Sequence, residues 1–296
     1  MASSKDTSKG IILVAGAGTG LSPTTFPISK ALLPVYDRPM IYCSISTLMS
    51  AGIRDILVIT SEADRHNFER TLKDGSHLGI RISYEIQHVQ RGISDAFIIA
   101  EDFIDGDPCV LMLGDNIFHG DGFQALMEEA SKDTENSNVF ARWVPDPKRF
   151  GIAEFDSEGK VISLEEKPKE PKSNYAVVGL YYLPGDVSSK AKRLTPSARG
   201  ELEITDLNRM YLEEGRLNVR VFGEDIFWKD AGTFDSLFES ADYIRRKEKE
   251  TGSLVLCPEI VAVKKGYVSN EKMLDWVASN KDNSYFLGIK DYIERM

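Results

Sequence analysis

The chain of 296 residues carries a net charge of −10 at pH 7, with 42% hydrophobic and 28% charged residues. This composition is ordinary for a globular protein, and the length allows one large domain or a domain with an added lobe. The acidic balance argues against a nucleic-acid binder that works by neutralising phosphates, but it permits a phosphate-bearing small molecule at a local basic site.

Strands and helices alternate over the first 138 residues. We expect strands at residues 11–15, 55–60, 81–86 and 108–114, and helices at residues 40–51, 67–72, 95–103 and 122–132. Short alternating units of this kind predict an α/β fold with a doubly wound, mostly parallel sheet. The polar residues 1–8 predict a disordered leader.

The pattern changes after residue 138. Turn-linked strands are expected at residues 139–144, 152–155, 161–164, 176–183, 217–222 and 226–230, and helices at residues 204–214, 234–251, 271–279 and 284–295. The change in pattern marks the end of a core over residues 9–138, and because no low-complexity linker interrupts the chain, we expect a soft boundary with a lobe rather than two separate domains. A lobe with the rest of the sheet would cover 139–232, and a helical C-terminal part 233–296.

Cysteine usage and hydropathy bear on the compartment. The three cysteines, Cys43, Cys109 and Cys257, lie far apart in apolar surroundings, so buried reduced thiols are expected. No apolar run reaches membrane-spanning length, and there is no secretory signal. These features favour a cytoplasmic protein.

A glycine-rich loop follows the first expected strand. Gly16, Gly18 and Gly20 occupy every second position after residues 11–15. Backbone N–H groups without a neighbouring Cβ can point at phosphate oxygens at the carboxyl end of such a strand. The loop is neither a Walker loop nor a GxGxxG motif, so a plain tight turn is the competing interpretation.

Two carboxylates are candidates for metal binding. Asp115 directly follows a buried strand, where ligands of open α/β sheets bind, and Mg²⁺ is commonly held by one or two carboxylates plus phosphate oxygens. The competing interpretation is a turn cap. Asp230 ends a later strand and is either the second carboxylate or the N-cap of the helix expected near Phe234.

Three further charged residues have two interpretations each. Lys30 lies just beyond the glycine-rich loop and could neutralise phosphate charge, or it could be an ordinary surface lysine. Glu166 and Lys167 lie between a strand and a proline turn. They could bind the hydroxyls and phosphate of a sugar phosphate, or they could form an exposed charged turn.

In this order, the motifs of the chain resemble those of the sugar-1-phosphate nucleotidyltransferases, especially the glucose-1-phosphate thymidylyltransferases. The motifs are residues 29–41 (SKALLPVYDRPMI), 113–118 (LGDNIF), 164–168 (LEEKP), 172–177 (KSNYAV), 196–206 (PSARGELEITD) and 228–233 (WKDAGT). The resemblance implies a homotetramer that converts dTTP and glucose 1-phosphate to dTDP-glucose and pyrophosphate.

The resemblance also implies roles for individual residues. Asp115 and Asp230 would hold Mg²⁺, and Lys30 would act beside them. The nucleotide would be bound by Leu13, Gly16, Gly18, Thr19, Gln87 and Gly92. The sugar phosphate would be bound by Gly151, Glu166, Lys167, Val177 and Trp228.

Several positions depart from the family pattern, mostly in the nucleotide half. Gly20 stands where the family has a catalytic arginine, a type of loss that typically costs on the order of 10²–10⁵ in rate. The other departures are Ala15 for glycine, Ala31 for glutamine, Arg91 for aspartate, Asp95 for glutamine and Phe150 for tyrosine.

Two hypotheses follow. The first is a thymidylyltransferase that is slow because of Gly20, with Arg91 or Lys30 partly replacing the lost arginine. The second is an inactive or repurposed member that binds a ligand without nucleotidyl transfer, in which Gly20→Arg would restore turnover. A dinucleotide-dependent oxidoreductase is disfavoured because Thr60 and Ser61 stand where an acidic ribose-binding residue would be needed.

Overall fold

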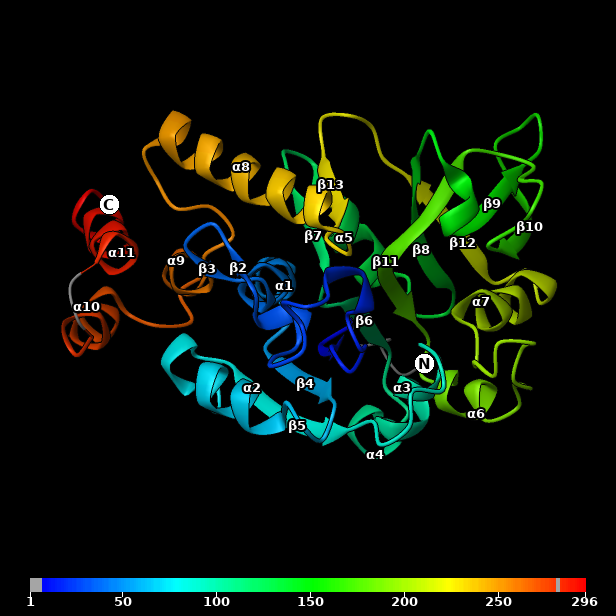
Figure 1. The fold of residues 1–296 in the computed structure, drawn as a ribbon, viewed down its shortest axis with the longest axis horizontal. Helices are drawn as coiled ribbons and strands as arrows, with labels where there is room; N and C mark the ends of the chain where they lie inside the picture. The colour runs from blue at the N-terminus through cyan, green and yellow to red at the C-terminus, as the bar shows by residue number, and fades with distance from the viewer. Residues whose placement is uncertain (1–6, 281–282) are drawn as a thin grey trace.

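The computed structural model describes residues 7–280 and 283–296. Nine strands of this part form one sheet, namely β1 (Lys9–Leu13), β4 (Asp55–Thr60), β5 (Arg81–Ile86), β6 (Cys109–Leu113), β8 (Ser137–Trp143), β9 (Gly151–Phe155), β10 (Val161–Glu166), β11 (Tyr175–Leu183) and β12 (Leu217–Val221). β5, β4, β1 and β6 are parallel neighbours. β11 lies antiparallel between β6 and β8, and β9 and β10 extend the sheet from β11 (Figure 1). The predicted α/β class is confirmed.

Two short ladders lie outside this sheet. β2 (Pro34–Val35) pairs with β3 (Arg38–Pro39), and β7 (Asn116–His119) pairs with β13 (Phe227–Asp230) in antiparallel register. The strand expected at residues 226–230 therefore pairs with the segment that follows β6. This ladder brings Asp230 beside Asn116.

Helices cover both faces of the sheet (Figure 1). They are α1 (Ile41–Ser50), α2 (Arg65–Leu72), α3 (Asp95–Ile99), α4 (Glu101–Ile104), α5 (Phe123–Lys132), α6 (Val187–Ala191), α7 (Ile204–Glu213), α8 (Phe234–Thr251), α9 (Pro258–Lys264), α10 (Asn270–Ala278) and α11 (Ser284–Glu294). The single helix expected over residues 95–103 is divided at Ala100 into α3 and α4.

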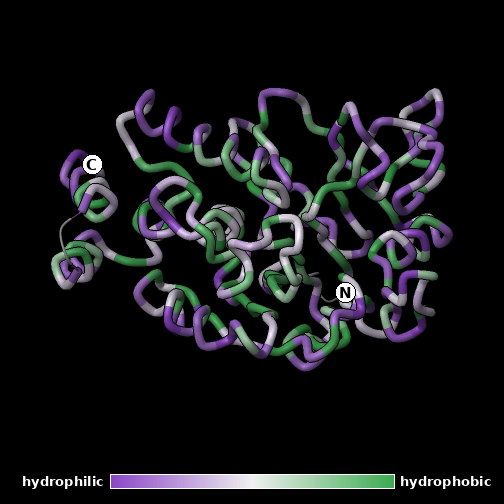
Figure 2. The backbone as a smooth tube through the Cα atoms, in the orientation of Figure 1, coloured by the Kyte–Doolittle hydropathy of each residue, from purple (hydrophilic) through white to green (hydrophobic). Residues whose placement is uncertain are grey.

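Alternate residues of each central strand enter different cores. Ile12 and Val58 pack with α1, α5 and α9, whereas Ile11 and Leu57 pack with α3, α6 and α7. A strand covered on both faces must be apolar along its whole length, which explains the continuous hydrophobic runs in the sequence. Hydrophilic residues gather instead on the outer helices and loops (Figure 2).

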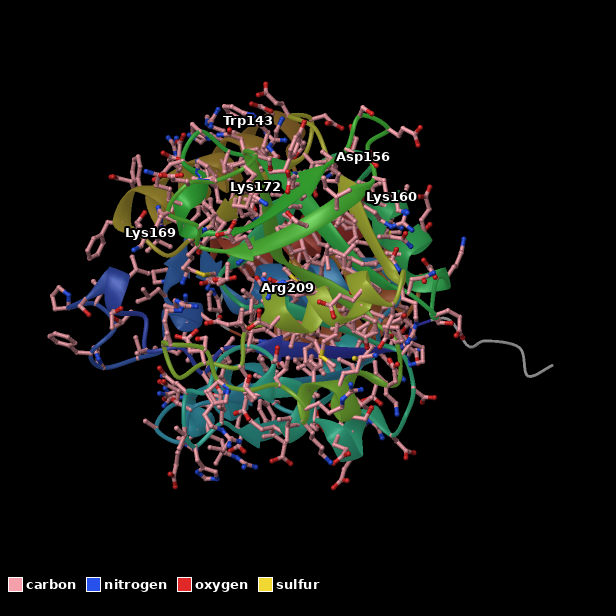
Figure 3. The ribbon with its side chains drawn as sticks, turned by 90° about the vertical axis from the view of Figure 1, so that its right-hand side faces the viewer. Trp143, Asp156, Lys160, Lys169, Lys172 and Arg209 are labelled. Atoms are coloured by element: carbon pink, nitrogen blue, oxygen red, sulfur yellow. The ribbon has the colours of Figure 1, made fainter. Side chains whose placement is uncertain are left out.

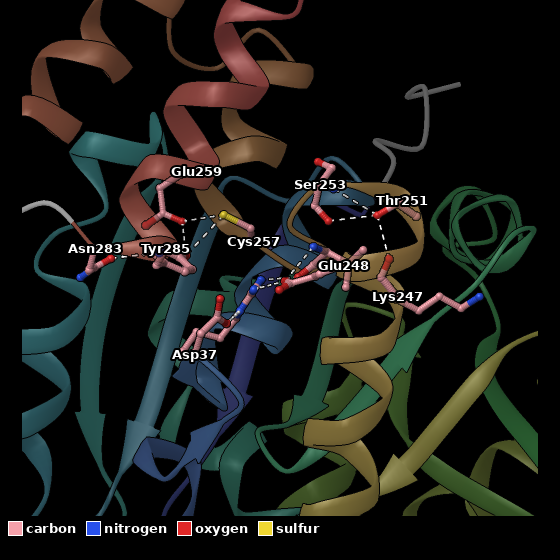
Figure 4. A network of polar contacts seen from close by, with 11 residues as sticks. Asp37, Lys247, Glu248, Thr251, Ser253, Cys257, Glu259, Asn283 and Tyr285 are labelled. Atoms are coloured by element: carbon pink, nitrogen blue, oxygen red, sulfur yellow. Dashed lines mark hydrogen bonds and ion pairs between the residues drawn. The ribbon is translucent and has the colours of Figure 1, made fainter.

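A buried polar network attaches the C-terminal helices to the segment that carries β2 and β3 (Figure 4). The fully buried Arg38 forms ion pairs with Asp37 and Glu248. Next to it, the Tyr285 hydroxyl donates a hydrogen bond to Glu259 at 2.6 Å. The expectation for the cysteines is confirmed, since Cys43, Cys109 and Cys257 are buried and free.

The N-terminal segment is only partly described. Residues 1–6 of the expected leader lie outside the described residues. Thr7 is buried and donates its backbone N–H to the carbonyl oxygen of Ser131 at 2.9 Å. Among the described helices, none has the length and apolar character needed to span a bilayer.

Candidate active site

The glycine-rich loop starts at the carboxyl edge of the parallel sheet. Leu13 ends β1 between Ile59 of β4 and Leu113 of β6. Gly18 adopts a φ of 62° before a short 3₁₀ turn (Thr19–Leu21), and the Thr25 hydroxyl donates to its carbonyl at 2.9 Å. This edge is where ligands of open α/β sheets bind.

Gly20 approaches a second glycine across the site. A Cβ atom added to Gly20 would lie 2.3 Å from the carbonyl oxygen of Gly232. A Cβ at Gly16, by contrast, would have no neighbour within 4 Å. The loop therefore rests on the turn that follows Asp230, at the position where the family pattern has arginine.

Two of the predicted nucleotide-binding residues, Gln87 and Gly92, belong to an internal hydrogen-bond network. Gln87 is buried, and its side-chain amide donates to the Gly92 carbonyl at 3.3 Å and to Asp95 at 3.0 Å. Arg91 donates to the other carboxylate oxygen of Asp95 at 2.7 Å. Two departures from the family pattern thus pair with each other, and one of them, Asp95, also accepts a hydrogen bond from the amide nitrogen of Gln87.

The two predicted metal-binding carboxylates lie together. The backbone N–H of Ala231 donates to the Asp115 carbonyl at 2.9 Å, and Lys30 forms an ion pair with the Asp115 carboxylate. The pKa of Asp230 is raised to about 6, mainly because the carboxyl is buried and secondly because the negative charge of Asp115 repels it. Burial also raises the pKa of Asp115, but the Lys30 ammonium outweighs it and leaves that pKa below its ordinary value.

The alternative role for Asp230 is wrong, because Thr233 caps α8. Its hydroxyl accepts the backbone N–H of Ser236 at 3.2 Å, and the Ser236 hydroxyl accepts the backbone N–H of Thr233 at 3.0 Å. The Asp230 side chain instead contributes to the wall of a cavity. A bound cation would relieve the repulsion between the two carboxylates. Because Mg²⁺ is commonly held by one or two carboxylates plus phosphate oxygens, these residues beside the glycine-rich loop fit a Mg²⁺ site.

All five predicted sugar-binding residues line one cavity of about 170 Å³, together with Asp230. They are Gly151, Glu166, Lys167, Val177 and Trp228. A Cβ at Gly151 would lie 2.8 Å from the Thr205 hydroxyl, so a larger residue would press on that wall. The glycine therefore keeps this part of the cavity open.

Glu166 ends β10 and is partly buried, whereas Lys167 follows it in an exposed bend. The Thr205 hydroxyl donates to Glu166, and Arg199 lies 3.5 Å from the same carboxylate. Burial raises the pKa of Glu166, and the hydrogen bond from Thr205 opposes this rise. Lys167 has a φ of 43° and donates its backbone N–H to the Phe150 carbonyl at 3.0 Å.

Asn116 was not among the predicted site residues, yet it joins the two halves of the site. Its amide nitrogen donates to Asp115 at 3.0 Å. Its amide oxygen accepts the backbone N–H of Gly179 at 3.1 Å and the indole N–H of Trp228 at 2.8 Å. Its position beside Asp115 in the 113–118 motif was the available signal. Likewise, Arg199 lies within the 196–206 motif.

Asn116→Asp should weaken binding of the expected sugar phosphate, glucose 1-phosphate, and any turnover of it by about 10–100-fold. The new carboxylate can still accept from Gly179 and Trp228, but it places a buried negative charge beside Asp115. Calorimetry with glucose 1-phosphate and a turnover assay would measure the effect. Unchanged values would show that the hydrogen bond to Asp115 is dispensable. Asn174→Asp, at an amide that bonds the Val144 carbonyl outside the site, is the matched control.

Asp230→Asn should stabilise the metal-free protein at pH 8 by about 1–3 kcal/mol. Because the pKa of Asp230 is raised from 3.8 to about 6, the folded state binds the proton more readily than the unfolded state. Stability from this group therefore falls as pH rises through that window. Thermal unfolding in chelator at pH 8 and pH 5 would test this. A gain that grows toward pH 5 would contradict it.

The carboxyl edge of the parallel sheet thus holds a glycine-rich loop and a carboxylate pair beside a small cavity, which is where open α/β proteins bind their ligands. The family described as "Nucleotidyl transferase" matches residues 9–247. The chain belongs to this family.

Curated relatives match nearly the whole chain. A glucose-1-phosphate thymidylyltransferase of Neisseria meningitidis serogroup A is 48% identical over 277 residues, covering 94% of this chain and 96% of that protein. One from Mycobacterium tuberculosis is 46% identical over 287 residues, covering 97% and 99%.

A solved structure from Bacillus anthracis, assigned as a glucose-1-phosphate thymidylyltransferase and in complex with sucrose, also matches. It is 42% identical with a TM-score of 0.75, over 80% of this chain and 95% of that chain.

Proposed function

We propose that this protein is a thymidylyltransferase that converts dTTP and glucose 1-phosphate to dTDP-glucose and pyrophosphate. The observation that carries the proposal is the carboxylate pair Asp115 and Asp230, of which Asp230 lines the same cavity as Glu166, Lys167 and Trp228. The 46–48% identity to the thymidylyltransferases above supports the choice of substrates.

The reaction requires positioning and charge stabilisation more than covalent catalysis. A phosphate oxygen of the sugar phosphate attacks the α-phosphorus, the new P–O bond forms, and the bond to the β-phosphate oxygen breaks to release pyrophosphate. Asp115 and Asp230 would hold Mg²⁺, which when bound neutralises phosphate charge. Lys167 would bind the sugar phosphate, and Glu166 would accept hydroxyl hydrogen bonds.

The second candidate function is that of a family member that binds ligands without nucleotidyl transfer, and its support comes from the nucleotide half of the site. The specific observation is the contact between Gly20 and Gly232, which leaves no room for a side chain at the position of the family arginine. In the first function, Lys30 supplies a cation beside Asp115.

Pyrophosphate release from dTTP, glucose 1-phosphate and Mg²⁺ would separate the two functions. Turnover above a protein-free control supports the transferase. Binding of both substrates by calorimetry without pyrophosphate release supports the second function and overturns the first. The homotetramer and the lobe over residues 139–232 stay predictions, and sedimentation of the full chain would test the oligomer.

A further inference from the structure

A second, larger cavity adjoins the sugar cavity. It encloses about 620 Å³, within the range of about 300–1,000 Å³ common for ligand sites. Its walls come from the segment after β8, the segment before β13, and α8. No predicted role accounts for this cavity, although it is larger than the sugar cavity of about 170 Å³.

The two cavities share part of their lining. Arg149, Phe150, Trp228 and Asp230 contribute to both. The rings of Phe150 and Trp228 lie 5.7 Å apart, and Asn116 fixes the Trp228 indole at 2.8 Å. A group attached to a sugar in the smaller cavity could therefore extend past these side chains into the larger cavity.

The lining combines aromatic surface with charges of both signs. Trp143 is 55% exposed and stands at the upper edge of the outer face of the lobe (Figure 3). Phe227 and Tyr243 stack with their centroids 3.8 Å apart. Aromatic faces pack against the apolar face of a sugar ring, and carboxylates and guanidinium groups bond its hydroxyls.

The charge balance narrows the ligand class. The lining holds as many acidic as basic side chains, including Asp146, Glu224 and Asp225 on the acidic side. A second phosphate group would find no net positive field there, whereas a neutral polyhydroxylated ring can use donors and acceptors alike. The cavity thus suits an uncharged sugar better than a second nucleotide.

We propose that the acceptor site extends beyond a single hexose and that the larger cavity binds a second sugar ring carried by the sugar 1-phosphate. This proposal rests on the proposed function, since it assigns the first ring and its phosphate to the smaller cavity. It makes Trp143 a specificity-determining residue that contacts only the second ring.

Calorimetry on the full chain would compare glucose 1-phosphate with maltose 1-phosphate and isomaltose 1-phosphate. We expect at least one disaccharide phosphate to bind as tightly as glucose 1-phosphate or more tightly. Trp143→Ala should weaken that ligand roughly tenfold and leave glucose 1-phosphate unchanged. Phe238→Ala, an exposed aromatic of α8 outside the cavity lining, should change neither affinity.

The possible failures are distinguishable. Binding of glucose 1-phosphate with rejection of both disaccharide phosphates overturns this inference alone. Equal weakening of all ligands by Trp143→Ala also overturns it. A change in sedimentation of that variant without a change in affinity shows a second copy of the chain at this cavity and overturns it as well. Failure to bind any sugar phosphate overturns the proposed function.

Discussion

Asp115→Asn should lower pyrophosphate release by on the order of 10³-fold while leaving glucose 1-phosphate binding within a few-fold. Asp115 is 8% exposed, and its carboxylate lies at the end of β6 between Lys30 and the side chain of Asn116. The neutral amide removes one of two carboxylates and leaves the Lys30 ammonium without its partner. The sugar cavity keeps Glu166 and Lys167, so acceptor binding and transfer should separate.

The control for this variant is Asp121→Asn, at an exposed aspartate on the segment between β7 and α5. It removes the same charge from the protein without touching the site. Turnover and the affinity for Mn²⁺, used as a probe in place of Mg²⁺, should match the wild type in the control. Both should fall together in Asp115→Asn. If Asp115→Asn retained turnover within tenfold, the carboxylate pair could not be the centre of transfer.

The fold was predictable where a single strong signal decided the structure. The apolar runs of β1, β4 and β6 are covered on both faces, so burial alone specifies them. α8 matches the expected residues 234–251, because periodicity and caps agree over five turns. One short strand, β7, was not predicted from the sequence. Asn116–His119 forms strand β7 only because Phe227–Asp230 lies opposite, and no local pattern encodes that pairing.

The sequence predicted several residues that line the candidate cavity, but it did not predict the hydrogen bonds that connect them. The motifs placed Glu166, Lys167 and Trp228 in one cavity, since family resemblance marks residue types at fixed positions. Asn116 was missed because its importance comes largely from hydrogen bonds to two partners that are distant in the sequence, Gly179 and Trp228. The contact between Gly20 and Gly232 joins segments more than 200 residues apart through backbone atoms, which leave no trace in side-chain patterns.

That contact changes what Gly20 means for activity. From sequence, Gly20 is a lost arginine, and Gly20→Arg would be expected to restore a charge to an otherwise intact loop. In the structure, any Cβ at this position meets a backbone oxygen of Gly232, and backbone cannot rotate away as a flexible side chain can. The loop must therefore move off the turn that positions Asp230 before a guanidinium can be accommodated.

Gly20→Ala should destabilise the protein by about 1–3 kcal/mol, and Gly20→Arg should fail to raise turnover above the wild type. Gly16→Ala, in the same loop but with no neighbour within 4 Å, should change stability by less than about 0.5 kcal/mol. Thermal unfolding and pyrophosphate release on the three variants would test this. A gain in turnover for Gly20→Arg at wild-type stability would mean that the loop leaves the Asp230 turn at little cost. Gly20 would then reflect only the loss of the family's arginine, and the contact with Gly232 would not require a glycine.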